Sequence, residues 1–520
     1  MKIYITGLLL IAGLLSFTSC SDFLDEEPKY SIPSQEYYKT ETQARANVNA
    51  LYRRGAPQRY SDAASAYVGP NASIPTMLTG YFTNSYEGQE LVCLYAKELT
   101  RQQHTSVISP TMNSIWDSCY AAINTANGAI KYIPGIKMEA ANVDKLVAEA
   151  KFFRAYNYFY LIKTFGDVPL VVEPYEKLEN LYPERNTTAS VYAVIEADLK
   201  EAVEKLPATT FLANARRITK YAAAMALANV YLQQNKFAEA ATYAKIVTSS
   251  AHKLTPNGDY GTNSAFNKLR TTDDLDEVIY AQEFDAGIRN SSWWPTYAFS
   301  SSATAVFTSY SIFERVFGPT DRFLNVYGVN DLRIKPNQFF HWEYTHPTTG
   351  KKWTSQAAGV WYYFDEAAVL GAGQGTKDWN FYRFSEALLI AAEAIAKSTG
   401  VTAEAAGYLA QVRSRADVTG KTVAEYTSEL QVLSVDRFVE ECWTERLREL
   451  PLEFKMWDDC LRTGKFPVIS PTEKGKVEYQ TLIGAKNGFG ATFKESDLLW
   501  PISPDELQRN KSLKQNPGYN

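Results

Sequence analysis

Two stretches of small and apolar residues, joined by a short polar turn, constrain the fold of this chain more than any other feature. The first stretch spans 220–232, the turn is Asn235-Lys236, and the second spans 237–247. Alanines recur on both stretches, at Ala222, Ala223, Ala226, Ala240, Ala241 and Ala244. Apolar residues at helical spacing on both sides of a break predict two packed helices. The alanines allow the helices to approach closely, and aromatic residues fill the seam, at Tyr231, Phe237 and Tyr243.

This predicted hairpin resembles a tetratricopeptide unit, which has alanine at the helix crossing and an aromatic residue in the second helix. A single unit cannot bury its apolar face, so further helices must stack on it. The stretch 145–165, which ends near Gly166, carries an aromatic stripe at helical spacing. The other candidate helices are 40–54, 115–133, 191–206, 381–397 and 403–415. We therefore expect a scaffold of stacked helix pairs, with Thr40 and Gln43 forming a capping box at the start of the first candidate.

Composition excludes several classes of protein. A chain of 520 residues that is 45% hydrophobic and 21% charged can bury a large core. The net charge is −5, and the two signs are interspersed, so a nucleic-acid partner has no electrostatic support. The cysteines beyond residue 20 are scattered, at Cys93, Cys119, Cys442 and Cys460. They form no disulfide framework, although the sequence allows a single bridge.

The region 256–380 has a different composition, because glycine, serine, asparagine and aromatic residues replace the alanine-rich pattern. Six of the ten tryptophans lie there: Trp293, Trp294, Trp342, Trp353, Trp361 and Trp379. A smaller aromatic cluster, at residues 81–86, lies in another stretch rich in glycine, threonine and asparagine. Loops held by a rigid scaffold are frequent binding sites, so we expect the ligand in these regions.

Aromatic loops of this kind suit sugars, because a pyranose ring offers an apolar face to an aromatic ring and hydroxyls to nearby polar groups. The candidate ligand-binding residues are Trp293, Trp294, Tyr297, Tyr81, Tyr86, Trp342 and Trp353. The competing interpretation is that each ring packs in the core. Adjacent Trp293 and Trp294 are the favoured pair, because two neighbouring indoles in a loop seldom both face inward.

No catalytic or metal-binding pattern stands out. The carboxylate pairs of the chain, such as Asp273-Asp274 and Asp458-Asp459, are too generic to nominate as a glycosidase pair. His341 and His346 do not have the spacing of a helical zinc motif. The glycine run 371–375 lacks the lysine of a phosphate-binding loop. We therefore predict no catalytic residue, no metal and no cofactor.

The first residues of the chain predict export and a lipid anchor. Lys2 precedes an apolar run from Leu8 to Leu15, which is too short to span a bilayer, and small residues lead to Cys20. We interpret 1–19 as a lipoprotein signal peptide, Cys20 as the lipidated residue and 20–35 as an acidic tether. A plain secretory signal with an incidental cysteine is the alternative. The tether resembles the surface-export signal of certain Gram-negative lipoproteins, which implies a location outside the cell.

Motifs recur along nearly the whole chain, in the segments 20–25, 115–117, 124–127, 149–155, 165–170, 217–223, 383–387, 412–416, 499–502, 506–507 and 515–519. Together these motifs resemble those of the SusD/RagB-like outer-membrane lipoproteins, which capture glycans at the cell surface. One segment departs from the family pattern. Where the family has Glu-Gly-x-Arg, this chain has Glu453-Phe454-Lys455-Met456, which puts the local turn and its buried arginine in doubt. We expect this departure to lie away from the ligand surface.

The resemblance implies a mostly α fold, in which a scaffold of about four tetratricopeptide-like helix pairs supports a loop-rich region with little β structure. The expected parts are an N-terminal helical region 36–255, a ligand-binding region 256–380 and a C-terminal helical region 381–520. It also implies a non-enzymatic outer-membrane protein that delivers oligosaccharide or polysaccharide to a SusC-like TonB-dependent transporter. A receptor for peptide or another non-sugar nutrient is the alternative, and a surface glycoside hydrolase is less favoured.

Overall fold

The computed structural model describes residues 37–56, 71–85, 91–176, 181–285, 287, 292–307 and 315–519. The expected signal peptide 1–19, Cys20, the tether 20–35 and Tyr86 lie outside the described residues, so their roles stay predictions. Within the described residues, none of the helices combines the length and the apolar character that a membrane crossing requires.

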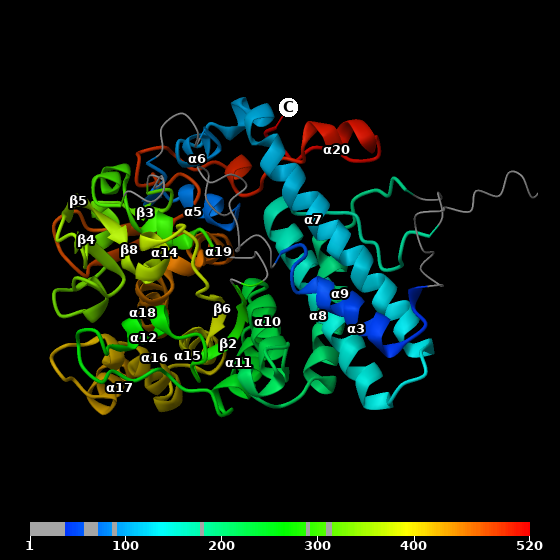
Figure 1. Ribbon diagram of the computed structural model, residues 1–520, viewed down its shortest axis with the longest axis horizontal. Coiled ribbons are helices and arrows are strands. Elements are labelled where there is room, and N and C mark those ends of the chain that lie inside the picture. Colours follow the sequence, from blue (N-terminus) through cyan, green and yellow to red (C-terminus); the bar gives the residue numbers. More distant parts are fainter. Residues whose placement is uncertain are drawn as a thin grey trace, which may run out of the picture.

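The long helices form one continuous stack. They are α7 (Thr105–Tyr132), α8 (Ala140–Phe165), α9 (Thr188–Lys205), α10 (Lys220–Gln233), α11 (Phe237–Thr248), α15 (Phe384–Thr399), α16 (Ala403–Ala416) and α18 (Val435–Glu449). From α7 to α11 each helix packs on the next, α11 then packs on α15, and α15 packs on both α16 and α18. Figure 1 shows α7, α8 and α9 on one side of the molecule and α15, α16 and α18 on the other. The mostly helical, tetratricopeptide-like scaffold is confirmed.

Shorter helices and turns of helix cover the stack and its ends. They are α3 (Glu41–Leu51), α5 (Ile74–Met77), α6 (Leu91–Lys97), α12 (Ala265–Thr271), α13 (Asp321–Leu324), α14 (Glu366–Leu370), α17 (Val423–Gln431), α19 (Met456–Thr463) and α20 (Pro504–Arg509). The capping box of α3 is confirmed, because Thr40 Oγ1 accepts from the Gln43 N–H and Gln43 Oε1 accepts from the Thr40 N–H. Near the end of the chain, α20 returns to pack on α7 (Figure 1).

The alanine-rich hairpin forms as the sequence predicts. Among its alanines, Ala222 and Ala244 are fully buried, and the rings of Tyr231 and Tyr243 stack with centroids 5.6 Å apart. The turn between α10 and α11 places Asn235 in the left-handed region, with φ of 58°. Asparagine tolerates this conformation better than most residues, which explains why the helix ends there.

The strands of the described residues form four antiparallel pairs. They are β1 (Phe82–Thr83) with β3 (Gly318–Pro319), β2 (Val278–Gln282) with β6 (Trp379–Arg383), β4 (Phe340–Thr345) with β5 (Lys352–Val360), and β7 (Lys465–Ile469) with β8 (Val477–Thr481). The expected helix 381–397 begins later, at Phe384, because residues 381–383 pair with β2 instead. All five residues of β6 are buried, so burial between β2 and the scaffold outweighs the local helical pattern.

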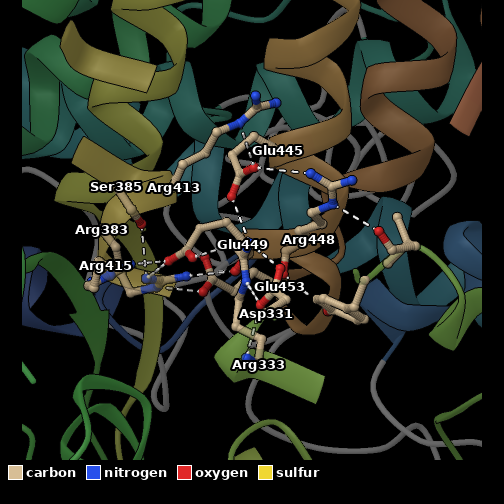
Figure 2. A network of polar contacts seen from close by, with 12 residues as sticks. Asp331, Arg333, Arg383, Ser385, Arg413, Arg415, Glu445, Arg448, Glu449 and Glu453 are labelled. Carbon is tan, nitrogen blue, oxygen red and sulfur yellow. Dashed lines mark hydrogen bonds and ion pairs between the residues drawn. The ribbon is translucent and has the colours of Figure 1, made fainter. Parts of the chain in front are cut away.

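A buried network of arginines and glutamates joins α15, α16 and α18. Figure 2 shows Arg333, Arg383 and Arg415 converging on Glu449. Arg383 Nη1 lies 2.8 Å from Glu449 Oε1, Arg333 Nη1 lies 3.0 Å from Glu449 Oε2, and Arg415 also pairs with this carboxylate. Burial alone would raise the pKa of Glu449, but the three arginines lower it to about 2. Glu449 is therefore an ionised, buried anchor of the scaffold.

The described cysteines do not form a disulfide. Cys93, Cys119, Cys442 and Cys460 are all buried free thiols, and burial raises the pKa of Cys442 and of Cys460. Protonated thiols of this kind act as small apolar side chains in the core.

Candidate functional site

A pocket lined by aromatic side chains lies where the loop-rich region meets the scaffold. We call it the aromatic pocket. It is lined by Ser292, Trp294, Pro295, Tyr362, Tyr363, Gly375, Lys377, Asp378, Trp379, Asn380 and Glu453. Its wall is a stack of rings, since the Trp294 and Trp379 centroids are 4.5 Å apart and those of Trp379 and Phe454 are 5.2 Å apart. Both pairs are nearly parallel, at 14° and 13°.

Phe454, which stands where the family pattern has glycine, packs behind this wall. Its backbone keeps the left-handed conformation, with φ of 59°, that glycine adopts without strain. Its ring stacks on Trp294 and Trp379. The expectation that this departure lies away from the candidate ligand residues is therefore wrong. A side chain at the glycine position therefore supports the two tryptophans that line the pocket.

The family motif places a buried arginine at position 456, and in this chain the positive charge comes instead from position 455. Met456, at the family's arginine position, is buried, whereas Lys455 extends inward. Lys455 Nζ donates to the Phe381 carbonyl at 3.1 Å and lies 3.4 Å from Glu386 Oε2. A lysine one residue earlier thus provides a positive charge beside Glu386, although with fewer donors than an arginine.

Two carboxyl groups of the aromatic pocket have raised pKa values. Burial, together with the neighbouring charge of Asp273, raises the pKa of Asp378 to about 7. Burial raises the pKa of Glu453 to about 7 as well, although Glu453 Oε1 accepts from Arg383 Nε at 2.6 Å. The second oxygen of Glu453 has no hydrogen-bond partner in the described part of the chain. The pocket thus combines an apolar wall with carboxyl groups that bind or release a proton near neutral pH.

A larger, charged cleft adjoins the aromatic pocket, and Asp378 lines both. We call it the charged cleft. It is lined by Asn49, Tyr52, Arg53, Ala215, Arg216, Arg217, Asp273, Tyr280, Ala281, Gln282, Glu283, Phe284, Asp285 and Asp378. Arg53 Nη1 donates to the Glu283 carbonyl, and Arg216 Nε lies 3.2 Å from the Glu283 carboxylate. Positively and negatively charged side chains therefore line this cleft.

The backbone of the charged cleft is strained at two consecutive positions. Ala215 and Arg216 both have left-handed backbones, with φ of 51° and 57°. Such conformations cost side-chain-bearing residues roughly 1 to 2 kcal/mol each and persist only where the surroundings enforce them. Here the Arg216 N–H donates to the Phe211 carbonyl at 2.9 Å, and its guanidinium pairs with Asp274. Arg216 lines the charged cleft from this left-handed turn.

The structure separates the two neighbouring tryptophans. Trp293 is half-buried, whereas Trp294 is 5% exposed and forms the wall of the aromatic pocket. Trp342 is also half-buried, at an irregularity of register between β4 and β5. Such bulges redirect side chains. In this structure Trp293 and Trp342 keep part of their surface accessible.

The remaining candidates are enclosed by protein. Tyr81 and Tyr297 are each 1% exposed and Trp353 is 3% exposed. The Tyr81 hydroxyl donates to the Pro467 carbonyl at 2.7 Å, and Trp353 Nε1 donates to Ser302 Oγ at 3.0 Å. Their rings are engaged in packing in this conformation, and their contact with a ligand stays a prediction.

Several lining residues carry no signal in the sequence. Asp378, Lys377, Asn380 and Glu453 join the aromatic pocket through the β2–β6 pairing and the turn after α18. Tyr363 joins it from the turn after β5, and its ring lies 4.3 Å from Trp294. Among the residues that line the pocket, Trp294 was a candidate from the sequence, and Trp379 had a signal as a member of the tryptophan-rich region. Pairing between distant segments, rather than a local motif, assembles these residues.

The two histidines considered as metal ligands, His341 and His346, have structural roles. Burial lowers the pKa of His341 to about 4, and His341 Nε2 lies 2.7 Å from the Ala298 carbonyl. His346 Nδ1 accepts from the Thr348 N–H. Among the described residues, no group of three or more His, Cys, Asp or Glu has a metal-binding arrangement.

Comparisons with known proteins place the chain in a family. The sequence model described as "SusD family" matches residues 341–519, and the model described as "Starch-binding associating with outer membrane" matches residues 22–232. A curated SusD-like protein of Formosa agariphila is 26% identical, and the match covers 98% of both chains.

Solved structures agree. A SusD superfamily protein of Parabacteroides distasonis has a TM-score of 0.78 at 26% identity, covering 92% of this chain and 99% of that one. The surface glycan-binding protein A of Bacteroides thetaiotaomicron, solved with laminarihexaose, has a TM-score of 0.69 at 18% identity, covering 92% and 100%. The fold, the two sequence models and the full-length relatives together show that this chain belongs to the SusD family.

Proposed function

We propose that this protein is a lipid-anchored, non-catalytic glycan receptor of the outer cell surface, which delivers oligosaccharide or polysaccharide to a SusC-like TonB-dependent transporter. The observation that carries the proposal is the junction of the aromatic pocket with the charged cleft at Asp378. An apolar ring wall beside charged and amide groups matches the two kinds of surface that a sugar presents. The names of related proteins, which refer to starch and laminarihexaose, support the same ligand class.

In this proposal the glycan enters across Trp293 and Trp342, whose rings are partly accessible. Trp294, Trp379 and Phe454 shape the pocket from behind. Asp378 is placed to accept or donate hydrogen bonds to sugar hydroxyls at the junction. Tyr81, Tyr297 and Trp353 support the neighbouring loops through packing.

Binding without cleavage is the chemical part of the proposal. A glycosidase needs one carboxylic acid and one carboxylate on opposite sides of the scissile bond. Glu453 is instead bonded to Arg383, whose other contacts are with Glu449 and Glu277 in the buried network. We therefore assign Glu453 a structural role in the scaffold. We assign Asp378, whose pKa is raised, a role in sugar binding.

The test is a binding screen of the chain from Ser21 onward against polysaccharides that include laminarin and starch, by affinity gels followed by calorimetry. We expect one glycan class to bind and no reducing sugar to be released. Trp293→Ala should weaken binding by about tenfold or more, because truncating an aromatic anchor commonly costs more than about 1.4 kcal/mol. Tyr182→Ala is the control, because Tyr182 is a 60% exposed aromatic residue outside the region 256–380.

Sugar release, or unchanged affinity in Trp293→Ala, would contradict the proposed site. The anchor and partner need a separate test in the native membrane. Cys20→Ser should free the protein from the membrane, because one or more acyl chains would be lost. Crosslinking of the unaltered protein should capture a TonB-dependent barrel, and its failure to do so would count against the transporter partner.

A further inference from the structure

The charged cleft has enough open space for part of a glycan chain. Its cavity volume is about 530 Å³. Ligand pockets in proteins usually have volumes of about 300 to 1,000 Å³, so sugar rings fit here without rearrangement of the walls. A ligand that fills this space meets the charged side chains of the lining directly. The balance of those charges therefore determines which glycans the cleft accepts.

Two of the three arginines that line the charged cleft are already neutralised by carboxylates. Arg217 donates to both oxygens of Glu149, from Nε at 3.0 Å and from Nη2 at 2.5 Å. Arg216 pairs with Asp274 and also lies 3.2 Å from the Glu283 carboxylate. A sulfate or carboxylate group of a ligand would have to displace these carboxylates in order to form charge-assisted hydrogen bonds with either guanidinium.

Two carboxylates of the charged cleft, by contrast, have no cationic partner. Within the described part of the chain, Asp378 and Asp285 accept hydrogen bonds from the backbone N–H groups of Phe284 and Gly287 and form no ion pair. The third arginine, Arg53, lies over the ring of Phe284, 5.6 Å from the ring centroid. The cleft thus carries negative charge that its own cations do not neutralise.

The surroundings of Asp378 already resist one negative charge. Burial, followed by the neighbouring charge of Asp273, raises the pKa of Asp378 to about 7, and Glu283 has an effect in the same direction. Lys377 lowers this pKa, but its Nζ is bonded to Asp273 at 2.5 Å. Arg216, the nearest cation to Glu283, is shared with Asp274. A second anion placed beside Asp378 would meet the same burial and the same like charges.

We propose that the charged cleft accepts neutral glycans and excludes sulfated or carboxylated ones, and that Asp378 is the residue that discriminates between them. This inference rests on the proposed function, because it names the substrate class of the same site. Asp378 lines both the cleft and the aromatic pocket, so a glycan that spans their junction passes it. A sugar hydroxyl can donate a hydrogen bond to this carboxylate, whereas a sulfate ester brings a like charge and no proton.

The experiment compares each neutral polysaccharide of the binding screen, laminarin and starch among them, with its sulfated derivative. Calorimetry on the chain from Ser21 onward gives the two affinities and their ratio. At pH 8 we expect the neutral form to bind at least about tenfold more tightly, because like charges placed side by side suppress the wrong ligand. Sulfate esters stay ionised between pH 5 and pH 8, so a change of the ratio within this range comes from the protein.

The ratio of affinities should fall about threefold or more when the pH is lowered from 8 to 5.5. Asp378, with its pKa of about 7, is mostly ionised at the higher pH and mostly protonated at the lower one. Protonation removes the like charge that the sulfated ligand meets. Glu453 has a similar pKa, so the variants of Asp378 must show which carboxyl group is responsible.

Asp378→Asn isolates the charge, because asparagine keeps an oxygen that can accept from the Phe284 N–H. At pH 8 we expect this variant to reduce the ratio about three- to tenfold and to flatten its dependence on pH. Asp285→Asn removes the second unpaired charge of the cleft, and we expect it to reduce the ratio less, because Asp285 is exposed. It gives a second result if Asp378→Asn does not fold.

Asp259→Asn is the matched control for the loss of one negative charge. Asp259 is exposed and, like Asp378, accepts hydrogen bonds from backbone N–H groups, those of Gly261 and Asn263. Its loop is held against the end of α16, where the Tyr260 hydroxyl donates to a backbone carbonyl. We expect the ratio of affinities and its pH dependence to match those of the wild type.

Three outcomes would overturn this inference and leave glycan capture in place. They are equal or tighter binding of the sulfated form by the wild type at pH 8, an unchanged ratio in a folded Asp378→Asn variant, and an equal reduction of the ratio in Asp259→Asn. Failure of every polysaccharide to bind, neutral or sulfated, would instead contradict the proposed function, and this inference with it.

Discussion

The scaffold around α18 and the region around the β4–β5 hairpin bury polar and aromatic groups in different ways. Around α18, arginines and glutamates are paired in the interior, as with Arg383 and Glu449. Around the hairpin, a separate small core is built on Phe299, whose ring meets His341 and Trp353 edge-on with centroids 4.9 and 5.0 Å away. The first region depends on charge balance, and the second depends on the fit of rings. Mutations should therefore act globally in one and locally in the other.

The largest effect should come from removing the shared carboxylate of the scaffold. Glu449→Gln leaves Arg333, Arg383 and Arg415 without their common partner and should lower the free energy of unfolding by about 3 to 5 kcal/mol. Urea denaturation measures this change. Glu440→Gln is the control, because Glu440 pairs with the exposed Arg437 and should cost less than about 1 kcal/mol. Equal losses of unfolding free energy in Glu449→Gln and Glu440→Gln would show that the buried ion-pair network is no more important to stability than a surface pair.

Truncating a ring of the small core should cost somewhat less, and its effect should stay local. Phe299→Ala should destabilise the hairpin region by about 3 kcal/mol, because the cavity loses ring contacts on several sides. We expect faster amide hydrogen exchange in β4 and β5 and unchanged exchange in α15. Faster exchange in α15 as well would show that the two regions unfold together. Tyr182→Ala serves as an exposed aromatic control.

Acid should weaken the scaffold through Glu449. Its pKa is about 2 in the folded protein and ordinarily 4.5, so its contribution to stability is fully present above about pH 4.5 and is lost as the pH falls towards 2. This contribution is on the order of 3 kcal/mol. Denaturation curves between pH 2 and pH 6 should show a steeper loss of stability in the wild type than in Glu449→Gln. Parallel pH profiles would mean that Glu449 does not carry the acid sensitivity.

The smallest expected difference is the one between two variants of Phe454. Phe454→Ala loses the ring and keeps the left-handed strain, whereas Phe454→Gly loses the ring and relieves the strain. Both variants should be less stable than the wild type, and the glycine variant should be more stable than the alanine variant by about 1 kcal/mol. Thermal denaturation of the three proteins tests this order. An alanine variant as stable as the glycine variant would exclude strain at this position.

The helices of the scaffold were predictable because their signals are local. The alanine-rich hairpin and the capping box of Thr40 and Gln43 depend on residues within a few positions of one another, and both appear as expected. The start of α15 was not predictable in the same way. Residues 381–383 carry a helical pattern but pair with β2, which is about a hundred residues earlier in the chain.

The candidate site was predictable only in outline. Trp293 and Trp294 are identical neighbours, and no local signal says which one turns inward. Trp294 is buried because Trp379 and Phe454 provide parallel rings on which it stacks. Those partners come from distant segments, and Phe454 stands where the family pattern has no side chain at all. The sequence therefore indicated the aromatic region, while the arrangement of its rings depends on tertiary packing.

The pairing of β2 with β6 has a further consequence. Because α11 packs directly on α15, the helical stack is continuous across the whole segment that separates them in the chain. Much of that segment leaves and re-enters the stack through β2 and β6, which lie side by side as a two-stranded neck. The segment beyond the neck is also tied to the stack at a second point, because Arg333 pairs with Glu449 on α18. The loop-rich region is thus held to the helices by a backbone pairing at its two ends and by a buried ion pair in between.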